Sequence, residues 1–362
     1  MKMQEPIITF VVPAYNVEMT VSECLDSLLE QTLIAHKIII VNDGSTDSTG
    51  TICEEYARKY PSIIQYFYQT NAGLSAARNR GLENVTTELV TFLDSDDIQD
   101  RKFVEKLLDY LRSVDVLPDL ILTVPTIYDV SSNRTIEWYD EAELNSIVKV
   151  NVEGINQKQY RKTVIASDFP WLYSLEVNAC RKIFSAHYLK NEQFSFPEGL
   201  IWEDIPSHFW LIHNANSIGI LLNTGFIYRI NSGQQITSGR GKGRLDIIPI
   251  FNQLYDIISN DDWSLIERAF GIRLIVSFTK WFIDVTDVET IDELLKDLHV
   301  FYKKIPNQYF TAYFDTCSPH RRTEMLLVAI LRSPFYEVYK DYQTKESLKN
   351  MFYRIRRISR VK

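Results

Sequence analysis

The chain has 362 residues, of which 45% are hydrophobic and 24% charged, and its net charge is −8 at pH 7. This composition is ordinary for a soluble globular protein, and the length predicts two domains or one large domain with an appendage. The acidic balance argues against nucleic acid as a partner, because nucleic-acid-binding proteins usually carry a basic field. We expect neither a signal peptide nor a membrane span, since no apolar run reaches the ~18 residues that a span needs.

Strands and helices alternate over the first 125 residues. Compact apolar runs rich in β-branched residues predict the strands, and apolar residues at helical spacing predict the helices. The expected elements, in chain order, are strand 8–12, helix 21–31, strand 37–41, helix 46–60, strand 63–68, helix 75–83, strand 88–93, helix 102–112 and strand 119–124. This order is typical of an α/β fold with a mostly parallel sheet flanked by helices.

The remainder of the chain follows a different pattern. Residues 125–230 are rich in aromatic side chains and less regular, and the sequence is helical in character from about residue 245 onward. A Gly/Ser/Arg-rich stretch at 235–245 marks the boundary between these parts. The predicted division is therefore a first domain at 1–240, with halves at 1–125 and 126–240, and a helical C-terminal region at 241–362.

Polar segments directly follow four of the predicted strands, at residues 13–16, 42–47, 71–75 and 94–97. In such sheets the ligand lies beyond the carboxyl ends of the strands, so we expect these segments to share one edge. Gly44 permits a tight turn beside Asp43, and Arg78 and Arg80 bring charge that matches phosphate oxygens. The local alternatives are an Asx-turn with a helix cap for residues 42–47, and a solvated basic helix face for the arginines.

The run Asp94-Ser95-Asp96-Asp97 carries the highest density of carboxylates on this edge. Carboxylates gathered at a strand end repel one another unless they are compensated. A hard divalent cation, Mg²⁺ or Mn²⁺, would neutralise them through oxygen ligands. The alternative is helix capping, because Asp favours helix N-termini and a helix is expected shortly afterwards. The run alone favours capping, whereas its place beside three other polar segments favours the metal.

The segments VVPAYN (11–16), VNDGSTDST (41–49), NAGLSAARNRG (71–81) and FLDSDD (92–97) together resemble the signature of family 2 glycosyltransferases. The resemblance covers roughly residues 5–125, where the order and spacing of all four segments match. It implies the GT-A fold, with a catalytic domain at 1–240 whose halves bind the nucleotide-sugar and the acceptor. It also implies a UDP- or dTDP-linked sugar donor, with UDP favoured, and synthesis of a bacterial cell-surface polysaccharide.

The same resemblance implies roles for individual residues. Asp43 would hydrogen-bond the base, Asp96 would coordinate the Mn²⁺ or Mg²⁺ that bridges the two phosphates, and Asp97 receives no ligand role. The donor-binding residues that it implies are Pro13, Ala14, Tyr15, Asn16, Asp43, Asn71, Arg78, Asp94 and Ser95.

The segment GLIWED (199–204) resembles the acidic pair that this family carries before a helix. The match implies Asp204 as the general base, with Glu203 and Trp202 in the acceptor or donor-sugar site. Arg229 matches a later family segment in which a basic residue meets the diphosphate. The alternatives are helix capping for the acidic pair and a place in the core for Trp202.

The predicted chemistry is a single displacement at the anomeric carbon. One base and no covalent nucleophile imply inversion of the anomeric configuration, and we expect burial and Glu203 to raise the pKa of Asp204. The metal and the arginines would absorb the charge of the departing diphosphate.

Four other functions compete with the glycosyltransferase interpretation. A sugar-nucleotide pyrophosphorylase needs a Gly-rich loop after the first strand, and a Rossmann dehydrogenase needs G-x-G-x-x-G there, whereas this chain has Pro-Ala-Tyr-Asn at 13–16. A processive synthase is disfavoured because the chain lacks membrane spans and a Q-x-x-R-W motif. An inactive GT-A module that only binds a nucleotide-sugar or glycan is the main alternative, and the intact acidic pair argues against it.

Location and partners are predicted from cysteines and charge. The four cysteines are widely spaced without a C-x-x-C pair, so we expect no disulfide or zinc site and a cytoplasmic location. The tail 345–362 is basic with interleaved apolar residues, which fits either an amphipathic helix on the inner membrane face or a solvated or docked tail. The expected acceptor is a glycan or lipid-linked glycan. The helical region is expected to form a homo-oligomer, to bind acceptor, or to cover the core.

Overall fold

The protein is described by a computed structural model that covers residues 5–148, 163–222, 225–231, 241–287, 289–318 and 321–333. It forms two compact units. The first comprises Met1–Phe169 and Leu175–Ile236, and the second comprises Pro170–Ser174 and Thr237–Lys362. The predicted domain limits stay a proposal, and the basic tail 345–362 lies outside the described residues.

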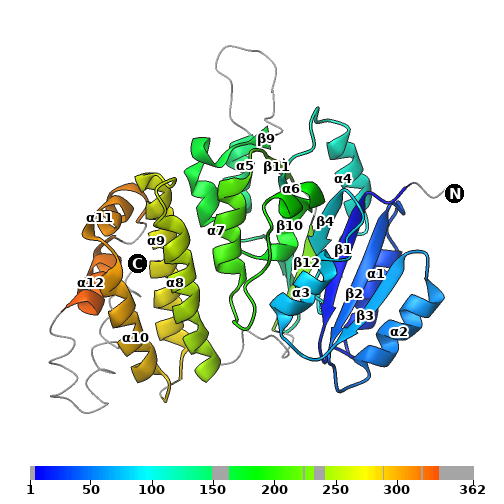
Figure 1. Cartoon of the computed structure of the whole chain (residues 1–362), viewed down its shortest axis with the longest axis horizontal. Helices are drawn as coiled ribbons and strands as arrows, with labels where there is room; N and C mark the ends of the chain where they lie inside the picture. Colours follow the sequence, from blue (N-terminus) through cyan, green and yellow to red (C-terminus); the bar gives the residue numbers. More distant parts are fainter. Residues whose placement is uncertain are drawn as a thin grey trace. The chain divides into compact units, whose positions relative to one another are not determined.

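An eight-stranded sheet forms the centre of the first unit (Figure 1). Its order is β3-β2-β1-β4-β10-β6-β11-β9, in which β10 and β9 run antiparallel to their neighbours and the other adjacent pairs are parallel. The strands are β1 (Ile8–Ala14), β2 (His36–Asp43), β3 (Ile64–Gln69), β4 (Leu89–Phe92), β6 (Leu120–Thr123), β9 (Thr163–Val164), β10 (Lys182–Ser185) and β11 (Ile218–Leu221). Continuous apolar runs form the central strands because helices cover both faces of the sheet.

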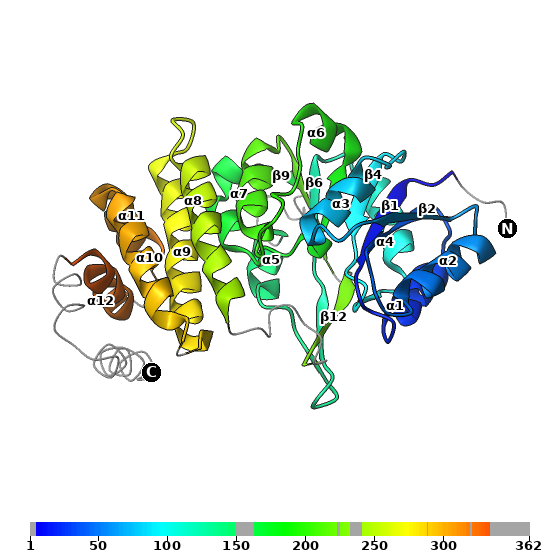
Figure 2. The same ribbon diagram turned by 60° about the horizontal axis from the view of Figure 1, so that its bottom comes forward.

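Helices connect these strands and pack on both faces. Figure 2 shows α1 and α2 on one face and α3 on the other, as right-handed crossovers require when the strand order reverses between β1 and β4. The helices of this unit are α1 (Val21–Leu29), α2 (Thr49–Lys59), α3 (Leu74–Leu82), α4 (Phe103–Leu111), α5 (Glu141–Val148), α6 (Ala186–Asn191) and α7 (Asp204–Asn214), with the 3₁₀ turns η1 (Ala166–Asp168) and η3 (Ala179–Arg181).

A second, four-stranded sheet lies in the same unit, with the order β5-β12-β7-β8. Its strands are β5 (Ile98–Gln99), β12 (Phe226–Ile230), β7 (Thr126–Asp129) and β8 (Arg134–Ile136). Strand β5 begins directly after Asp97 and pairs with β12 through Ile98 and Ile227. This pairing brings residues near position 229 beside the acidic run at 94–97.

The predicted α/β fold with a mostly parallel sheet is confirmed, whereas one helix start and one capping alternative are wrong. The helix expected from residue 46 starts at Thr49, and its N-cap residue is Ser48. The acidic run does not cap the helix expected after it, because β5 intervenes and Lys102 is the N-cap residue of α4. Asp100, not the acidic run, accepts a hydrogen bond from the Lys102 amide.

The second unit is helical, as the C-terminal sequence predicts. It contains η2 (Pro170–Ser174), η5 (Lys242–Asp246), α8 (Ile247–Ile258), α9 (Leu265–Val285), α10 (Ile291–Lys304), α11 (Asn307–Thr316) and α12 (Arg321–Arg332). Ser264 and Glu267 form a capping box at the start of α9, which satisfies backbone amides that a helix leaves unpaired. The Tyr173 hydroxyl donates to the Glu267 carboxylate and ties η2 to this helix.

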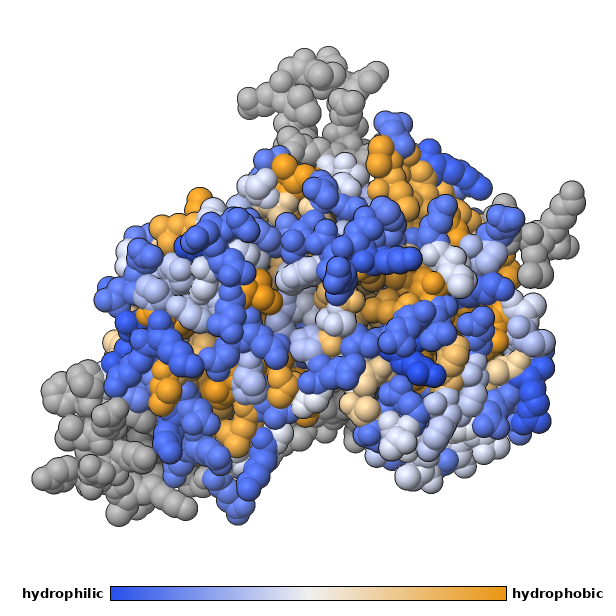
Figure 3. Space-filling view, viewed as in Figure 1, coloured by the Kyte–Doolittle hydropathy of each residue, from blue (hydrophilic) through white to orange (hydrophobic). Residues whose placement is uncertain are grey.

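Hydrophilic residues cover much of the face seen in Figure 3, with apolar residues between them. Among the described residues, no helix has the length and apolar character that crossing a membrane demands. The four cysteines are free in this structure.

Candidate nucleotide-sugar site

The four polar segments lie at the carboxyl ends of adjacent strands. Ala14 and Asn42 are register partners on β1 and β2, and Asp43 pairs with Gln69 on β3. Val11 pairs with Phe92, the last residue of β4, so the acidic run emerges beside β1. The sheet therefore brings the predicted site residues of this edge together.

The Asp43 carboxylate shapes the loop between β3 and α3. Its Oδ1 accepts hydrogen bonds from Gln69 Nε2 at 2.8 Å and from the Ala72 amide at 2.9 Å, and its Oδ2 accepts from the Gly73 amide at 2.8 Å. Gly73 has φ 93°, a left-handed conformation that glycine adopts without strain. The predicted base ligand thus also fixes the loop that carries Asn71, which is exposed.

The segment after β1 is held against the loop after β2. Asn16 has φ 51°, its amide donates to Ser45 Oγ, and its Oδ1 accepts from the Thr46 amide at 2.8 Å. Pro13 and Ala14 are buried within β1, whereas Tyr15 is 48% exposed. Of these residues Tyr15 presents its side chain at the surface, where an aromatic ring can stack on a base.

The acidic run forms a tight turn that β12 holds in place. The Asp97 amide donates to the Asp94 carbonyl at 2.9 Å, and Asp97 Oδ1 accepts from the Arg229 amide at 2.9 Å. The Arg229 guanidinium donates to the Asp96 carbonyl and to the Glu23 carboxylate on α1. Arg229 was predicted to bind the diphosphate, but in this structure it forms hydrogen bonds with the acidic turn.

The charges in this turn fit a divalent cation. Burial, and then the charge of Asp94, raises the pKa of Asp96 to about 6, and burial also raises the pKa of Asp97. The buried Asp97 Oδ2 has no hydrogen-bond partner. Among the described residues, no three His, Cys, Asp or Glu side chains are grouped to hold a metal ion. The turn suits Mg²⁺ or Mn²⁺ bound through one or two carboxylates together with substrate phosphates.

Arg78 lies at the centre of a carboxylate cluster. Its Nη1 donates to Glu203 Oε1 at 2.6 Å and to Asp204 Oδ1 at 3.0 Å, and its Nη2 donates to Asp94 Oδ1 at 3.0 Å. The Arg78 side chain is 1% exposed. These contacts join α3, the acidic turn and the start of α7, although the acidic pair follows Arg78 by more than 120 residues.

The acidic pair begins α7 but does not cap it. Glu203 occupies the N-cap position without a side-chain capping hydrogen bond, so the capping alternative is wrong for this residue. Desolvation, and then the charge of Asp204, raises the pKa of Glu203 to about 7. Asp204 Oδ2 accepts a 3.3 Å hydrogen bond from the Ala179 amide of η3. Both carboxylates are thus directed by specific donors.

Trp202, directly before this pair, has φ 76°. A bulky residue in the left-handed region is a genuine outlier, and such strain clusters at functional sites. The ring is half-buried, so the structure leaves both its predicted role at a sugar and its alternative in the core open. Ser95 is buried within the acidic turn.

Several contributors to this site were missed from the sequence. Phe92 and Phe196 lie against the Arg78 guanidinium, with ring centroids 5.8 and 5.5 Å from Cζ. Glu23 anchors Arg229, and the Ala179 amide anchors Asp204. Position along the chain gives no signal for these contacts, because each joins residues from separate elements.

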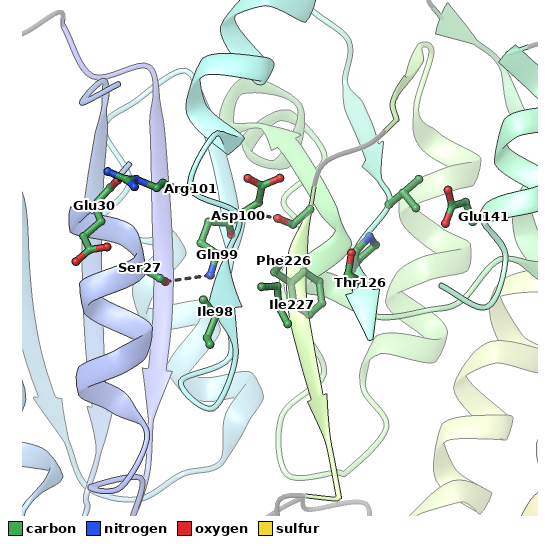
Figure 4. Close-up of a pocket in the computed structure, with 13 residues that line it drawn as sticks. Ser27, Glu30, Ile98, Gln99, Asp100, Arg101, Thr126, Glu141, Phe226 and Ile227 are labelled. Carbon is green, nitrogen blue, oxygen red and sulfur yellow. Dashed lines mark hydrogen bonds between the residues drawn. The ribbon is translucent and has the colours of Figure 1, made fainter. Parts of the chain in front are cut away.

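A cavity of about 540 Å³ borders the strand that follows the acidic run. Figure 4 shows Ser27 of α1 and Glu30, just after this helix, on one side and Thr126 and Glu141 on the other. Its lining residues are Ser27, Glu30, Ile98, Gln99, Asp100, Arg101, Val124, Pro125, Thr126, Glu141, Gly225, Phe226 and Ile227. None of the predicted site residues lines this cavity.

The fold and the shared strand edge define the GT-A class of nucleotide-sugar-binding architecture. The S. aureus TarS fragment 1-349 in complex with UDP-GlcNAc superposes with a TM-score of 0.65 at 20% identity, over 93% of this chain and 92% of that one. At this identity the likeness establishes the fold.

Residues 9–181 match the sequence model of Glycosyl transferase family 2. Glycosyltransferase GlyA of Streptococcus pneumoniae is 48% identical over 235 residues, which are 62% of this chain and 31% of GlyA. The minor teichoic acid biosynthesis protein GgaB of Bacillus subtilis is 26% identical over 77% of this chain and 29% of GgaB. The chain thus spans about a third of the length of these two relatives.

Proposed function

We propose that this protein is an inverting glycosyltransferase. It transfers a sugar from a metal-bound nucleotide-sugar, most simply a UDP-sugar, to an acceptor hydroxyl. The observation that carries this proposal is that Asp94, Glu203 and Asp204 all contact Arg78. The acidic pair therefore lies beside the strand ends that carry the predicted donor-binding residues. The match to the family model over residues 9–181 and the UDP-GlcNAc complex of the structural neighbour also support the proposal.

Asp204 is the proposed general base. One oxygen is held by Arg78 and the other by the Ala179 amide, so the carboxylate has a fixed orientation and retains lone pairs for an acceptor hydroxyl. The base removes the hydroxyl proton while the oxygen attacks the anomeric carbon, and the nucleoside diphosphate departs from the opposite face. This single displacement inverts the anomeric configuration. Glu203 and Trp202 border the reacting sugars.

Asp96 is the proposed metal ligand, with Asp94 as a contact to the ribose or donor sugar. A bound Mn²⁺ or Mg²⁺ supplies a Lewis acid for the leaving diphosphate. Tyr15, Asn16, Asp43 and Asn71 form the base and ribose side of the site, and Pro13 and Ala14 contribute through the strand that carries them.

The proposed acceptor is a glycan or lipid-linked glycan of a bacterial surface polymer, supported by the likeness to the teichoic acid protein GgaB. A cytoplasmic enzyme attached to the inner membrane face through the basic tail 345–362 would reach such an acceptor. Deleting this tail should lower binding to anionic liposomes. Unchanged binding would remove the membrane part of the proposal.

A donor panel tests the function itself. The protein is incubated with UDP-, dTDP- and GDP-sugars and Mn²⁺, and release of nucleoside diphosphate is followed with and without a chelator. We expect release from one nucleotide class that the chelator abolishes. Binding without release in the presence of acceptor glycans would instead establish an inactive binding module.

A further inference from the structure

Arg78 contacts three carboxylates from two other segments of the chain, and this arrangement bears on how the proposed base works. We infer that Arg78 is a positioning residue that fixes Asp204 and Glu203 relative to Asp94. The inference rests on the proposed function. It differs from the sequence expectation, in which Arg78 acts as a ligand of the nucleotide base or diphosphate.

Both carboxylate oxygens of Asp204, the proposed base, accept hydrogen bonds that fix its orientation. Arg78 Nη1 reaches Asp204 Oδ1 at 3.0 Å, and the Ala179 amide reaches Oδ2 at 3.3 Å. The same Nη1 donates to Glu203 Oε1 at 2.6 Å, so one nitrogen holds both members of the acidic pair. A rotation of the Arg78 side chain would release both carboxylates together.

The guanidinium itself has little freedom to move. It is buried against the rings of Phe92 and Phe196, and Nη2 is anchored on Asp94 at 3.0 Å. A planar guanidinium can serve several carboxylates at fixed angles, whereas a lysine ammonium is a point charge on a flexible stem. Position 78 therefore requires arginine, because the positive charge of a lysine would not reproduce these contacts.

The charges around Glu203 and Asp204 indicate a second role for Arg78. Asp204, Arg78 and Asp94 are the charged groups that face Glu203, and Arg78 is the one cation among these three. Burial and Asp204 together raise the pKa of Glu203 to about 7, and Arg78 opposes them. Loss of Arg78 would therefore raise the pKa of Glu203 further.

The two roles for Arg78 predict different kinetics. A ligand of the diphosphate would weaken donor binding when replaced, and its loss would appear in the donor KM. A positioning residue would lower kcat and shift the acid limb of the pH profile, while donor KM changes little.

The first test compares Arg78→Gln, Arg78→Lys and the control Arg58→Gln in the full chain with Mn²⁺ and the donor that the panel identifies. Arg58 is exposed near the end of α2 and is not a proposed site residue, so its replacement removes the same charge without touching the acidic pair. For Arg78→Gln we expect a loss of about 100-fold in kcat, donor KM within about threefold, and an acid limb higher by about one pH unit.

In Arg78→Lys we expect the acid limb to return toward that of the wild type, whereas kcat stays low because a point charge cannot hold both carboxylates. Arg58→Gln should match the wild type. A donor KM that rises as much as kcat falls, with an unchanged acid limb, would overturn the inference. If circular dichroism shows that Arg78→Gln does not fold, the kcat and KM of Arg78→Lys decide the matter on the same criteria.

A second measurement does not depend on turnover. Carboxyl ¹³C NMR of the ligand-free full chain, assigned with Glu203→Gln, should give a Glu203 midpoint near 7. We expect this midpoint to rise in Arg78→Gln and to stay near the wild-type value in Arg78→Lys. An unchanged midpoint in Arg78→Gln, or in an Arg78→Met variant if the former does not fold, overturns the charge role. Absence of any transfer by the wild type would instead overturn the proposed function, which separates the two failures.

Discussion

Glu203 and Asp204 are neighbours in sequence, yet their surroundings differ. The Glu203 side chain is 6% exposed and that of Asp204 is 19% exposed, and both contact the same Arg78 nitrogen. Pairs of carboxylates in unequal environments are where acid and base roles separate. The more accessible Asp204 therefore suits contact with an acceptor, and the buried Glu203 suits a supporting role beside the donor sugar.

The raised pKa of Glu203 predicts how stability depends on pH. Folding raises this pKa from 4.5 to about 7, so the favourable contribution of protonated Glu203 is complete below about pH 4.5 and is lost as the pH rises through about 7. Urea unfolding of metal-free protein between pH 4.5 and 8 measures this. We expect the unfolding free energy to fall more steeply with pH in the wild type than in Glu203→Gln. Equal slopes would show that Glu203 is ionised in the folded protein at neutral pH.

At single residues, the sequence identified chemical groups better than their partners. The order of the motifs singled out Asp43, Asp94 and Asp204, and the sheet and α7 bring the last two together. The contacts of Arg78 and Arg229 were not foreseen. The contacts of Arg78 with the acidic pair and of Arg229 with Asp97 each join segments more than 100 residues apart, and a local pattern carries no record of such pairings.

Helix α3 carries Arg78 and must lie close to β1 to place it. Gly81 allows this approach, because a Cβ atom there would lie 2.3 Å from Val11 Cγ1. Ala77 and Gly81 are both buried on the same side of the helix, so a small-residue face contacts the sheet. The glycine in NAGLSAARNRG is therefore explained by packing.

Gly81→Ala should consequently destabilise the first unit by about 1–3 kcal/mol, as overpacking of a filled core does. Thermal or urea unfolding measures the change. Gly241→Ala is the matched control, since the nearest atom to a Cβ there is 3.6 Å away. If both substitutions have equal small effects, α3 has room to move away from β1 and the close packing is not required.

At the level of elements, the strong periodic segments were predicted well and the small sheet was not. Strands β1, β2 and β4 are apolar runs with clear ends, and α4 has a regular apolar stripe. Strand β5 has two residues, too few for any periodicity, and it exists because β12 pairs with it from more than 120 residues away. Because of this pairing, the acidic run forms a turn held by Arg229 instead of capping a helix.

For the whole molecule, the proposed metal requirement predicts linked binding of ion and donor. A ligand at 100 times its Kd stabilises the fold by about 2.7 kcal/mol, which raises the melting temperature measurably. We expect the donor that the panel identifies, together with Mn²⁺, to raise the Tm more than either alone, and Asp96→Asn to remove the contribution of Mn²⁺. The exposed Asp115→Asn is the control for the same loss of charge. A full donor shift in Asp96→Asn would place the metal elsewhere.

The division into two units leaves the helical second unit without an assigned chemical role. The described site residues of the proposed mechanism all belong to the first unit. Specificity for donor and acceptor therefore has to be sought in the loops around the shared strand edge and in segments beyond the described residues. The catalytic proposal itself depends only on groups whose contacts are described above.

The most direct test of the account is single-turnover transfer by Asp204→Asn, compared with the wild type and with Asp115→Asn. The variant should fold and bind donor with Mn²⁺ as the wild type does, since the amide keeps the shape of the carboxylate. Loss of the base should lower the transfer rate by about 10²–10⁴-fold. Near-normal transfer by a folded, donor-binding Asp204→Asn would contradict the assignment of Asp204 as the base.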